Sequence, residues 1–339
     1  MKFQMVSFLF LSIFFVITGC SNESNANESG NQYVFSTQGL GTSFNTMTNA
    51  FTTIYDEKFN DGTEIHSQTT SPGGIAASYI IEQQTADITI GNAAPAIWAY
   101  EDGILDRPPV QDVRSVGGGL DAPVAIVVFT ENFVNRTGYT TLEEVIDDEY
   151  PVRIASKDTG SFGEVTQNVI LSELGVTYDD IRSWGGNITL TDSSNVIDML
   201  RDNRADITID HTNLNQANYV ELSLTTELHF AQLSDSLQDR LFEQGYARQT
   251  IPAGSFNGVV SEDMHTVGSP TTLLVHKSMP DDHAYILAKE MAENKEALVS
   301  SFSAFQDFEP ENACEPTRAG APLHPGAEQY YKESGCLES

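Results

Sequence analysis

The chain has 339 residues, a length that suggests two domains, and hydrophobic residues make up 40% of it, enough to bury a core. Its 17 Lys and Arg residues stand against 48 Asp and Glu, so the formal net charge is −31. A charge of this sign argues against nucleic acid as a partner and against a basic surface that binds anionic lipid. The 3 cysteines are too few for a disulfide scaffold or for a Cys-rich zinc site.

Residues 1–19 predict an export signal, because Lys2 precedes an apolar stretch over 5–17 and small residues stand before Cys20. A single membrane-spanning anchor is the alternative, but about 20 apolar residues are needed to cross a bilayer and this stretch is shorter. Residues 16–20 (VITGC) resemble a bacterial lipobox, which implies cleavage before Cys20 and lipidation of its sulfur. Residues 20–32 are then expected to form a polar tether that anchors an extracytoplasmic protein to the bacterial cell membrane.

Lipidation of Cys20 leaves Cys314 and Cys336 as a pair. An extracytoplasmic compartment is oxidising and permits a disulfide between them. Two free thiols or a redox pair are the alternatives, and no C-x-x-C spacing supports redox chemistry. We therefore favour a structural disulfide.

Strand and helix patterns alternate along the first half of the body. β-Branched and aromatic residues mark the strands, and apolar residues at helical spacing mark the helices. The predicted strands are 33–37, 64–70, 86–91 and 125–129, and the predicted helices are 44–55 and 75–80. The run at 125–129 (AIVVF) is apolar throughout, which is typical of a strand buried on both faces.

The second half repeats this alternation. Its predicted strands are 152–156, 187–190, 205–209 and 271–275, and its predicted helices are 165–174, 193–200 with a cap at Ser193-Ser194, and 280–298. The sequence ADITI occurs at both 86–90 and 205–209, which suggests two lobes built alike. The alternation predicts an α/β fold with mostly parallel sheets.

Three predicted strand-to-helix loops combine glycine with hydroxyl residues: 39–43, 71–74 and 159–161. The first turn of a helix carries N–H groups without intrahelical acceptors and a partial positive charge, so it can hold an anion. Ligands of open α/β sheets lie beyond the carboxyl ends of the strands, where such loops meet. Each loop alone is more simply an ordinary helix cap, but the three together indicate a site for a small carboxylate.

The sequence offers little that indicates catalysis or a bound cofactor or metal. The 7 histidines form no H-E-x-x-H motif, and no phosphate-binding G-K-[ST] loop or complete dinucleotide fingerprint occurs. Ser255 stands one place early for a G-x-S-x-G nucleophile elbow. The acids that flank the candidate loops can pair with an ammonium group of a ligand or lie exposed to solvent; they are Asp121, Asp158, Glu164 and Asp210.

Two segments of the second half resemble the TAXI subfamily of substrate-binding proteins of tripartite ATP-independent periplasmic (TRAP) transporters. Residues 323–335 (LHPGAEQYYKESG) resemble its HPGA…YY-x-E-x-G ending, and residues 251–258 (IPAGSFNG) resemble its IPAG-[aromatic]-x-G run. The three glycine-rich loops resemble its ligand loops more weakly. The chain departs from the subfamily where Ile75 replaces the serine of a GGS segment and where Asp210-His211 replaces an aromatic run.

The resemblance implies a type II periplasmic-binding-protein fold, in which two α/β lobes joined by two crossovers close around a ligand. We place the first lobe at 33–122 and 274–339, the second at 123–273, and the crossovers near 121–125 and 269–273. The residues expected in the ligand site are Gly41, Thr42, Ser43, Phe44, Pro72, Gly73, Gly74, Asn92, Thr159, Gly160, Ser161, Ser194 and Asp210. Glycines and hydroxyls would donate to carboxylate oxygens, and Phe44 would pack against the carbon chain of the ligand.

The resemblance also implies a function without catalysis. The protein would deliver an organic acid or amino acid, such as glutamate, a 2-oxo acid or a dicarboxylate, to the membrane subunits of a sodium-driven TRAP permease. Two alternatives stay open: a ligand sensor that docks on a membrane receptor kinase, and an enzyme of similar two-lobed build. The enzyme would need a nucleophile–base pair or a metal cluster, and neither occurs at a recognisable spacing.

Overall fold

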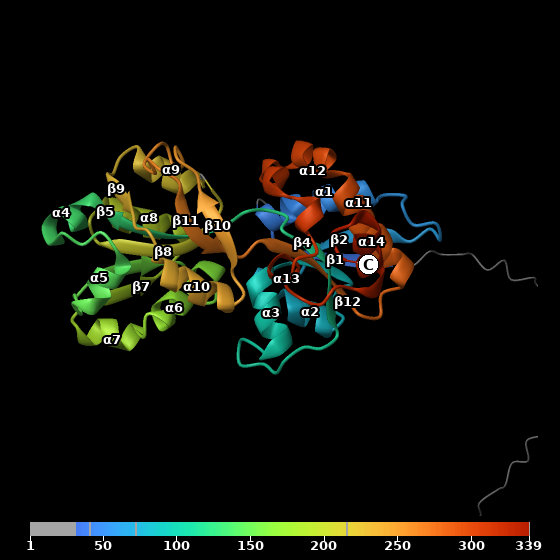
Figure 1. Cartoon of the computed structure of the whole chain (residues 1–339), viewed down its shortest axis with the longest axis horizontal. Helices are drawn as coiled ribbons and strands as arrows, with labels where there is room; N and C mark the ends of the chain where they lie inside the picture. The colour runs from blue at the N-terminus through green and yellow to red at the C-terminus, as the bar shows by residue number, and fades with distance from the viewer. Residues whose placement is uncertain (1–31, 41, 72, 215, 339) are drawn as a thin grey trace, which may run out of the picture.

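A computed structural model describes residues 32–338 except 41, 72 and 215, and it shows two α/β lobes side by side (Figure 1). The expected signal, the lipidation site Cys20 and all but the last residue of the expected tether lie outside the described residues. Gln32 itself begins the first strand, so it belongs to the folded body rather than to a tether.

The first lobe contains a five-stranded sheet in the order β2-β1-β3-β12-β4. Its strands are β1 (Gln32–Thr37), β2 (Glu64–Thr69), β3 (Ile88–Asn92), β4 (Val113–Gly118) and β12 (Thr271–His276). Its helical segments are α1 (Ser43–Tyr55), η1 (Gly74–Ala76), α2 (Ala77–Glu82), α3 (Ala93–Glu101), α11 (Asp281–Glu293), α12 (Lys295–Ser301), η2 (Ser303–Asp307), η3 (Pro310–Asn312), α13 (Pro316–Ala319) and α14 (Pro325–Ser334).

The second lobe contains a five-stranded sheet in the order β7-β6-β8-β5-β9 and a separate hairpin. Its strands are β5 (Val124–Thr130), β6 (Arg153–Ser156), β7 (Asn187–Leu190), β8 (Ile207–Thr212), β9 (Leu228–Phe230), β10 (Ala247–Ile251) and β11 (Met264–Gly268). Its helices are α4 (Glu131–Thr137), α5 (Leu142–Asp147), α6 (Phe162–Glu173), α7 (Tyr178–Ser183), α8 (Ser193–Arg201), α9 (Ala217–Ser223) and α10 (Asp235–Glu243).

The two sheets are built alike, as the repeated ADITI sequence suggests. Its two copies lead into β3 and β8, which occupy the middle of their sheets. Each of these strands pairs in parallel with one neighbour, β1 or β6, and antiparallel with a strand that follows a crossover, β12 or β5. The acids of the motif also act alike, since Asp87 accepts the backbone N–H of Val34 and Asp206 that of Arg153.

Each five-stranded sheet is mostly parallel, as expected, but one of its strands runs in the opposite direction to the other four. The chain enters a new lobe at the end where the two lobes meet, which is where the other strands of that lobe finish. A strand that starts there must run in the opposite direction. This is the case for β5 after the first crossover and for β12 after the second.

The crossovers lie at residues 119–123 and 269–270. The expected boundary after residue 273 is therefore displaced, because the whole of β12 pairs with β3 and β4 of the first sheet. Two other expectations also change in detail. Asp192, rather than Ser193-Ser194, caps α8, and the helix expected over 280–298 divides into α11 and α12 at Asn294.

Candidate functional site

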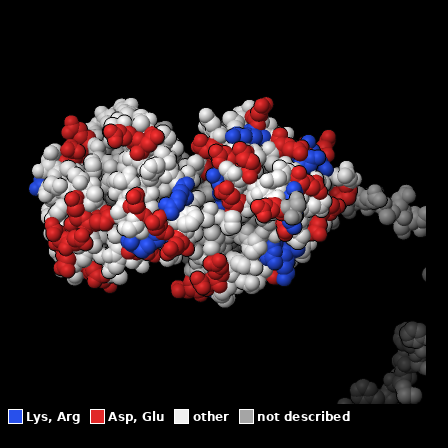
Figure 2. Space-filling model, in the orientation of Figure 1, with Lys and Arg blue, Asp and Glu red and all other residues white. Residues whose placement is uncertain are grey.

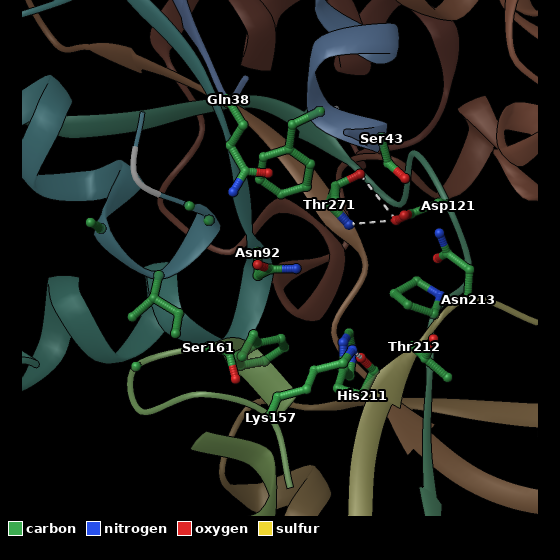
Figure 3. Close-up of a pocket in the computed structure, with 18 of the residues that line it drawn as sticks. Gln38, Ser43, Asn92, Asp121, Lys157, Ser161, His211, Thr212, Asn213 and Thr271 are labelled. Carbon is green, nitrogen blue, oxygen red and sulfur yellow. Dashed lines mark hydrogen bonds between the residues drawn. The ribbon is translucent and has the colours of Figure 1, made fainter. Parts of the chain in front are cut away.

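A cleft of about 670 Å³ lies between the two lobes. Side chains from the carboxyl ends of strands and from the first turns of helices line it on both sides (Figure 3). From the first lobe they include Gln38, Ser43, Phe44, Gly73, Gly74 and Asn92, and from the second Lys157, Gly160, Ser161, Phe162, His211 and Thr212.

Seven of the residues expected from the sequence line this cleft: Ser43, Phe44, Gly73, Gly74, Asn92, Gly160 and Ser161. Gly41 and Pro72 lie outside the described residues. The cleft thus brings together all three loops singled out by the sequence, although contact with a ligand stays a prediction for each residue. Gly74 packs so closely on Asn92 that a Cβ at position 74 would overlap the Oδ1 atom of Asn92.

Four expected residues do not line the cleft. Thr42 caps α1, and its hydroxyl accepts the N–H of Asn45. Thr159 and Ser194 are exposed, and the backbone N–H of Ser194 binds Asp192. Asp210 is 1% exposed and lies beneath the cleft wall rather than in it, because its carboxylate holds Lys157.

Two long helices point their N-termini into the cleft from opposite lobes. Ser43 is the first residue of α1, and Ser161 is the N-cap of α6, where its hydroxyl accepts the N–H of Glu164. Glu164 in turn accepts the N–H of Gly160 and so fixes the loop before the helix. The partial positive charges at both helix ends favour an anion between the lobes.

Lys157 adds a positive charge that the sequence analysis missed. Its Nζ lies 2.9 Å from Asp210 Oδ1 and lines the cleft. The other oxygen of Asp210 accepts the hydroxyl of Tyr219 at 2.9 Å. Burial, and then the negative charge of Asp210, raise the pKa of the Tyr219 hydroxyl well above its ordinary value. Its position in the sequence could have identified it as a cleft residue, because Lys157 directly follows a predicted strand in a chain with only 17 Lys and Arg residues.

Asn92 and His211 occupy equivalent places, each four residues after the Ile that opens its ADITI-derived strand. Both reach the second crossover. Asn92 Nδ2 lies 3.5 Å from the carbonyl oxygen of Ser269, and the N–H of Ser269 donates to His211 Nε2 at 2.9 Å. Burial, and then the charge of Lys157, lower the pKa of His211 to about 3. The imidazole is therefore neutral and carries its proton on Nδ1.

A structured loop brings Arg107 to the cleft. The buried Tyr79 organises this loop, since its hydroxyl accepts the N–H of Ile104 at 2.9 Å and its ring lies 4.9 Å from the Arg107 guanidinium. Gly103 has a φ of 82° and packs against the Arg107 carbonyl, so a side chain there would be strained and would clash. Arg107 forms no ion pair among the described residues, although acids outnumber bases in this chain, and it is free to face an anion.

The lobes also touch through α3. Trp98 Nε1 donates to the carbonyl oxygen of Gln244 at 2.6 Å, and the Trp98 ring packs against Tyr246 and Phe162 of the second lobe. Phe162 lines the cleft and contacts His211 with a centroid distance of 4.5 Å. The contact between the lobes is thus continuous with the cleft wall.

The two segments that most resemble the TAXI subfamily lie outside the cleft. Residues 252–259 form a turn after β10, in which Phe256 is fully buried and stacks on Phe230. His324 caps α14, and Gly326 lets that helix approach the carbonyl of Asp281 on α11. These segments stabilise the lobes rather than contact the ligand cleft.

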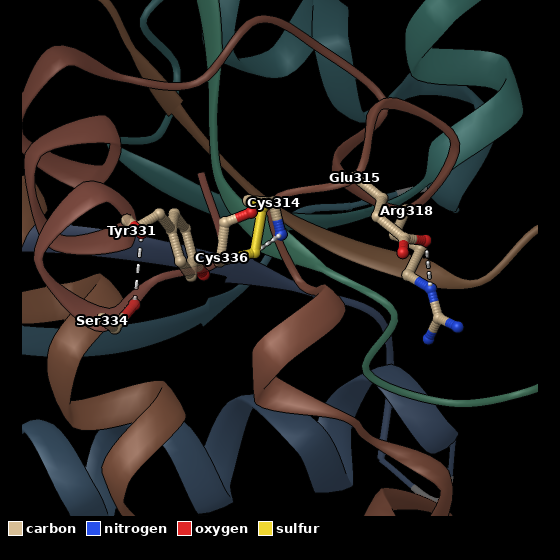
Figure 4. Close-up of a disulfide and its surroundings, with 6 residues drawn as sticks. All are labelled: Cys314, Glu315, Arg318, Tyr331, Ser334 and Cys336. Atoms are coloured by element: carbon tan, nitrogen blue, oxygen red, sulfur yellow. Dashed lines mark hydrogen bonds and ion pairs between the residues drawn. A yellow bond between two sulfur atoms is a disulfide. The ribbon is translucent and has the colours of Figure 1, made fainter. Parts of the chain in front are cut away.

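A disulfide joins Cys314 and Cys336 beside α14 (Figure 4). Cys314 is 7% exposed and packs in the core of the first lobe, with Cys336 against the same cluster. The bridge therefore fastens the end of the chain to the lobe.

Acidic side chains are spread over the visible faces of both lobes, and basic ones are fewer (Figure 2). Within the part of the chain that the structure describes, no helix is both long enough and apolar enough to cross a membrane. The same described residues contain no group of three or more His, Cys, Asp or Glu side chains arranged to hold a metal ion.

Solved structures share this fold at low sequence identity. MatC from Rhodopseudomonas palustris, solved with bound malate, has a TM-score of 0.51 and 12% identity over 89% of this chain and 98% of its own. A TctC solute-binding protein from Polaromonas, solved without ligand, has a TM-score of 0.50 and 12% identity over 91% of this chain and 98% of its own. The fold is that of the two-lobed periplasmic binding proteins. The model of the NMT1-like family matches residues 35–335, so the chain belongs to the NMT1-like family.

Proposed function

We propose that this protein is a solute receptor that captures a small organic anion, a carboxylate or an amino acid, by closure of its two lobes. The cleft between the lobes carries this proposal. Its volume of about 670 Å³ suits a small molecule, and both lobes and the first crossover contribute to its walls. A ligand held by both walls would favour the closed arrangement over an open one.

The chemistry of the walls favours a negative charge on the ligand. The N-termini of α1 and α6 meet there, with Ser43 and Ser161 as hydroxyl donors. Lys157 and Arg107 add positive charge. Because Lys157 is already paired with Asp210, Arg107 is the group whose charge a ligand would balance. A binding protein of the same fold was solved with malate, which makes a dicarboxylate a suitable first compound to test.

We also propose where the receptor works. The lipobox-like residues 16–20 support an extracytoplasmic protein anchored to the membrane through lipidated Cys20. The resemblance of residues 251–258 and 323–335 to the TAXI subfamily supports delivery of the ligand to a TRAP permease driven by a sodium gradient. The protein would thus bind and release its ligand without changing it chemically.

Native mass spectrometry of the purified protein, followed by thermal unfolding with a panel of solutes, tests this function. Malate, 2-oxoglutarate and glutamate represent the acids, and choline represents a cation. A ligand present at 100 times its dissociation constant is expected to stabilise the protein by about 2.7 kcal/mol. If choline stabilised the protein and no acid did, the proposed ligand class would be contradicted. If no compound of a wide panel stabilised it, the receptor function would be contradicted.

Replacing Ser161 with alanine is expected to weaken acid binding by about 0.5–3 kcal/mol, the range for a hydrogen bond to a neutral or charged group. The change also removes the cap of α6 and should lower the free energy of unfolding by about 1 kcal/mol. Ser234→Ala is the matched control, because Ser234 caps α10 in the same lobe and does not line the cleft. Calorimetric affinities that fall equally in both variants would remove Ser161 from the site.

A further inference from the structure

Asp121 is a buried acid at the junction of the two lobes. It lies in the first crossover, is 6% exposed and lines the cleft. Its Oδ1 atom accepts the N–H of Thr271 at 2.8 Å and the Thr271 hydroxyl at 3.0 Å (Figure 3). Thr271 directly follows the second crossover, so this carboxyl group ties the two crossovers together. Both bonds use Oδ1, so a proton on the other oxygen, Oδ2, would leave them in place.

Asp121 has no oppositely charged partner within the part of the chain that the structure describes. Among the described residues, no lysine, arginine or histidine forms an ion pair with it, and Lys157 is held by Asp210 while Arg107 lies over Tyr79. The charged side chain that acts on it electrostatically is Asp307 of η2, a like charge. Burial, opposed by the Thr271 hydrogen bonds and aided by Asp307, raises the pKa of Asp121 to about 6.

An anion that enters this cleft meets a second negative charge when Asp121 is ionised. Like charges in a partly desolvated site favour protonation of one of them. A protonated carboxyl also gains a donor, whereas an ionised one can only accept. The buried His211, with a pKa of about 3, stays neutral. The Asp121 carboxyl is therefore a group in the cleft wall whose protonation can change when a charged ligand binds.

We propose that Asp121 takes up one proton from solvent when an anionic ligand binds, donates a hydrogen bond from Oδ2 to that ligand, and returns the proton on release. This inference rests on the proposed anion-binding function and adds a regulation to it. Capture would be favoured at the lower pH of an acidified medium, and release at higher pH. An ionised Asp121 that pairs with an ammonium group of the ligand would give the opposite dependence.

Calorimetry of the purified protein with malate and 2-oxoglutarate tests the inference. Titrations at pH 7 in phosphate and in Tris, which differ in ionisation enthalpy, report the number of protons taken up. We expect uptake of about 0.5–1 proton per acid bound. Affinity should fall up to about tenfold from pH 7 to pH 8, an interval in which both malate carboxyls are already ionised.

Asp121→Asn is the informative variant, because the amide keeps the Oδ1 acceptor for Thr271 and offers N–H where the acid would offer O–H. It should bind both acids with no proton uptake and equally at pH 7 and 8. Asp158→Asn removes an exposed acid next to the cleft loop and should keep the uptake of the unsubstituted protein.

Three results would overturn the inference. Acid binding without proton uptake would do so while leaving the receptor function intact. Binding of glutamate that Asp121→Asn weakens would assign Asp121 to an ammonium group. Failure of every acid to bind would remove the anion-binding function and this inference together.

Discussion

Replacing Asp206 with alanine is expected to lower the free energy of unfolding by about 3 kcal/mol. The Asp206 side chain is 3% exposed and accepts the backbone N–H and two guanidinium N–H groups of Arg153, together with one from Arg136. Hydrogen bonds to a charged group contribute about 1.5–3 kcal/mol each, and members of one network do not add independently. Both arginines are partly exposed and can be rehydrated, which keeps the loss at the low end for a broken buried pair.

The repeated ADITI sequence supplies the matched control. Asp87 occupies the equivalent position in the first lobe and accepts one backbone N–H, from Val34, with no ion pair among the described residues. Asp87→Ala should therefore cost about 1.5 kcal/mol, the low end of that range for a single bond. Urea unfolding of both variants measures the difference. Equal losses would show that the two arginines contribute nothing beyond the backbone bond.

The contribution of Asp206 should also depend on pH. Burial alone would raise the pKa of this carboxyl, but the hydrogen bonds from Arg153 and Arg136 outweigh burial and hold it below the ordinary 3.8. A pKa lowered by folding gives stability that is present above the unfolded value and is lost as the pH falls through the folded value. The difference between the unsubstituted protein and Asp206→Ala should thus be constant near neutral pH and shrink below about pH 4.

The alternation of strands and helices was predictable because β1, α1, β6 and α6 carry local patterns that tertiary contacts reinforce. The repeat was visible in the sequence for the same reason, since Asp87 and Asp206 both fasten the start of a central strand to its neighbour. The direction of β5 and β12 was not predictable from pattern. It depends on where the chain changes lobe, which no local periodicity records.

The candidate site was predicted where it depends on loops and missed where it depends on distant contacts. Glycine and hydroxyl residues before helices identified Ser43 and Ser161 as cleft residues. Asp210 was expected in the cleft, but its carboxylate contacts Lys157 and Tyr219 instead. These partners lie 53 positions before it and 9 positions after it in the sequence. Arg107 depends on Tyr79, which lies 28 positions earlier in the chain. Sequence spacing alone does not reveal such pairings.

Loss of the Cys314–Cys336 disulfide should lower the free energy of unfolding by about 3 kcal/mol, from the chain entropy of a loop closed over a separation of 22 residues. Cys314→Ala/Cys336→Ala is the preferred variant, because Cys314 is buried in an apolar cluster where serine would add an unpaired hydroxyl. Denaturant unfolding of this variant, and of the unsubstituted protein with and without reductant, measures the effect. An unfolding midpoint that reductant leaves unchanged would contradict it.

The same variant should bind its ligand with unchanged affinity below the unfolding transition. Helix α14, beside the disulfide, lies on the side of the first lobe that faces away from the second lobe (Figure 1), and neither cysteine lines the cleft. Because the bridge acts mainly on the unfolded chain, its loss changes the population of folded receptor rather than the shape of the cleft. A weaker affinity measured on the fully folded variant would instead show that the C-terminal segment positions the first lobe for closure. The structural route would run through β4, which contacts α13 and α14 and pairs with β12 beside the second crossover.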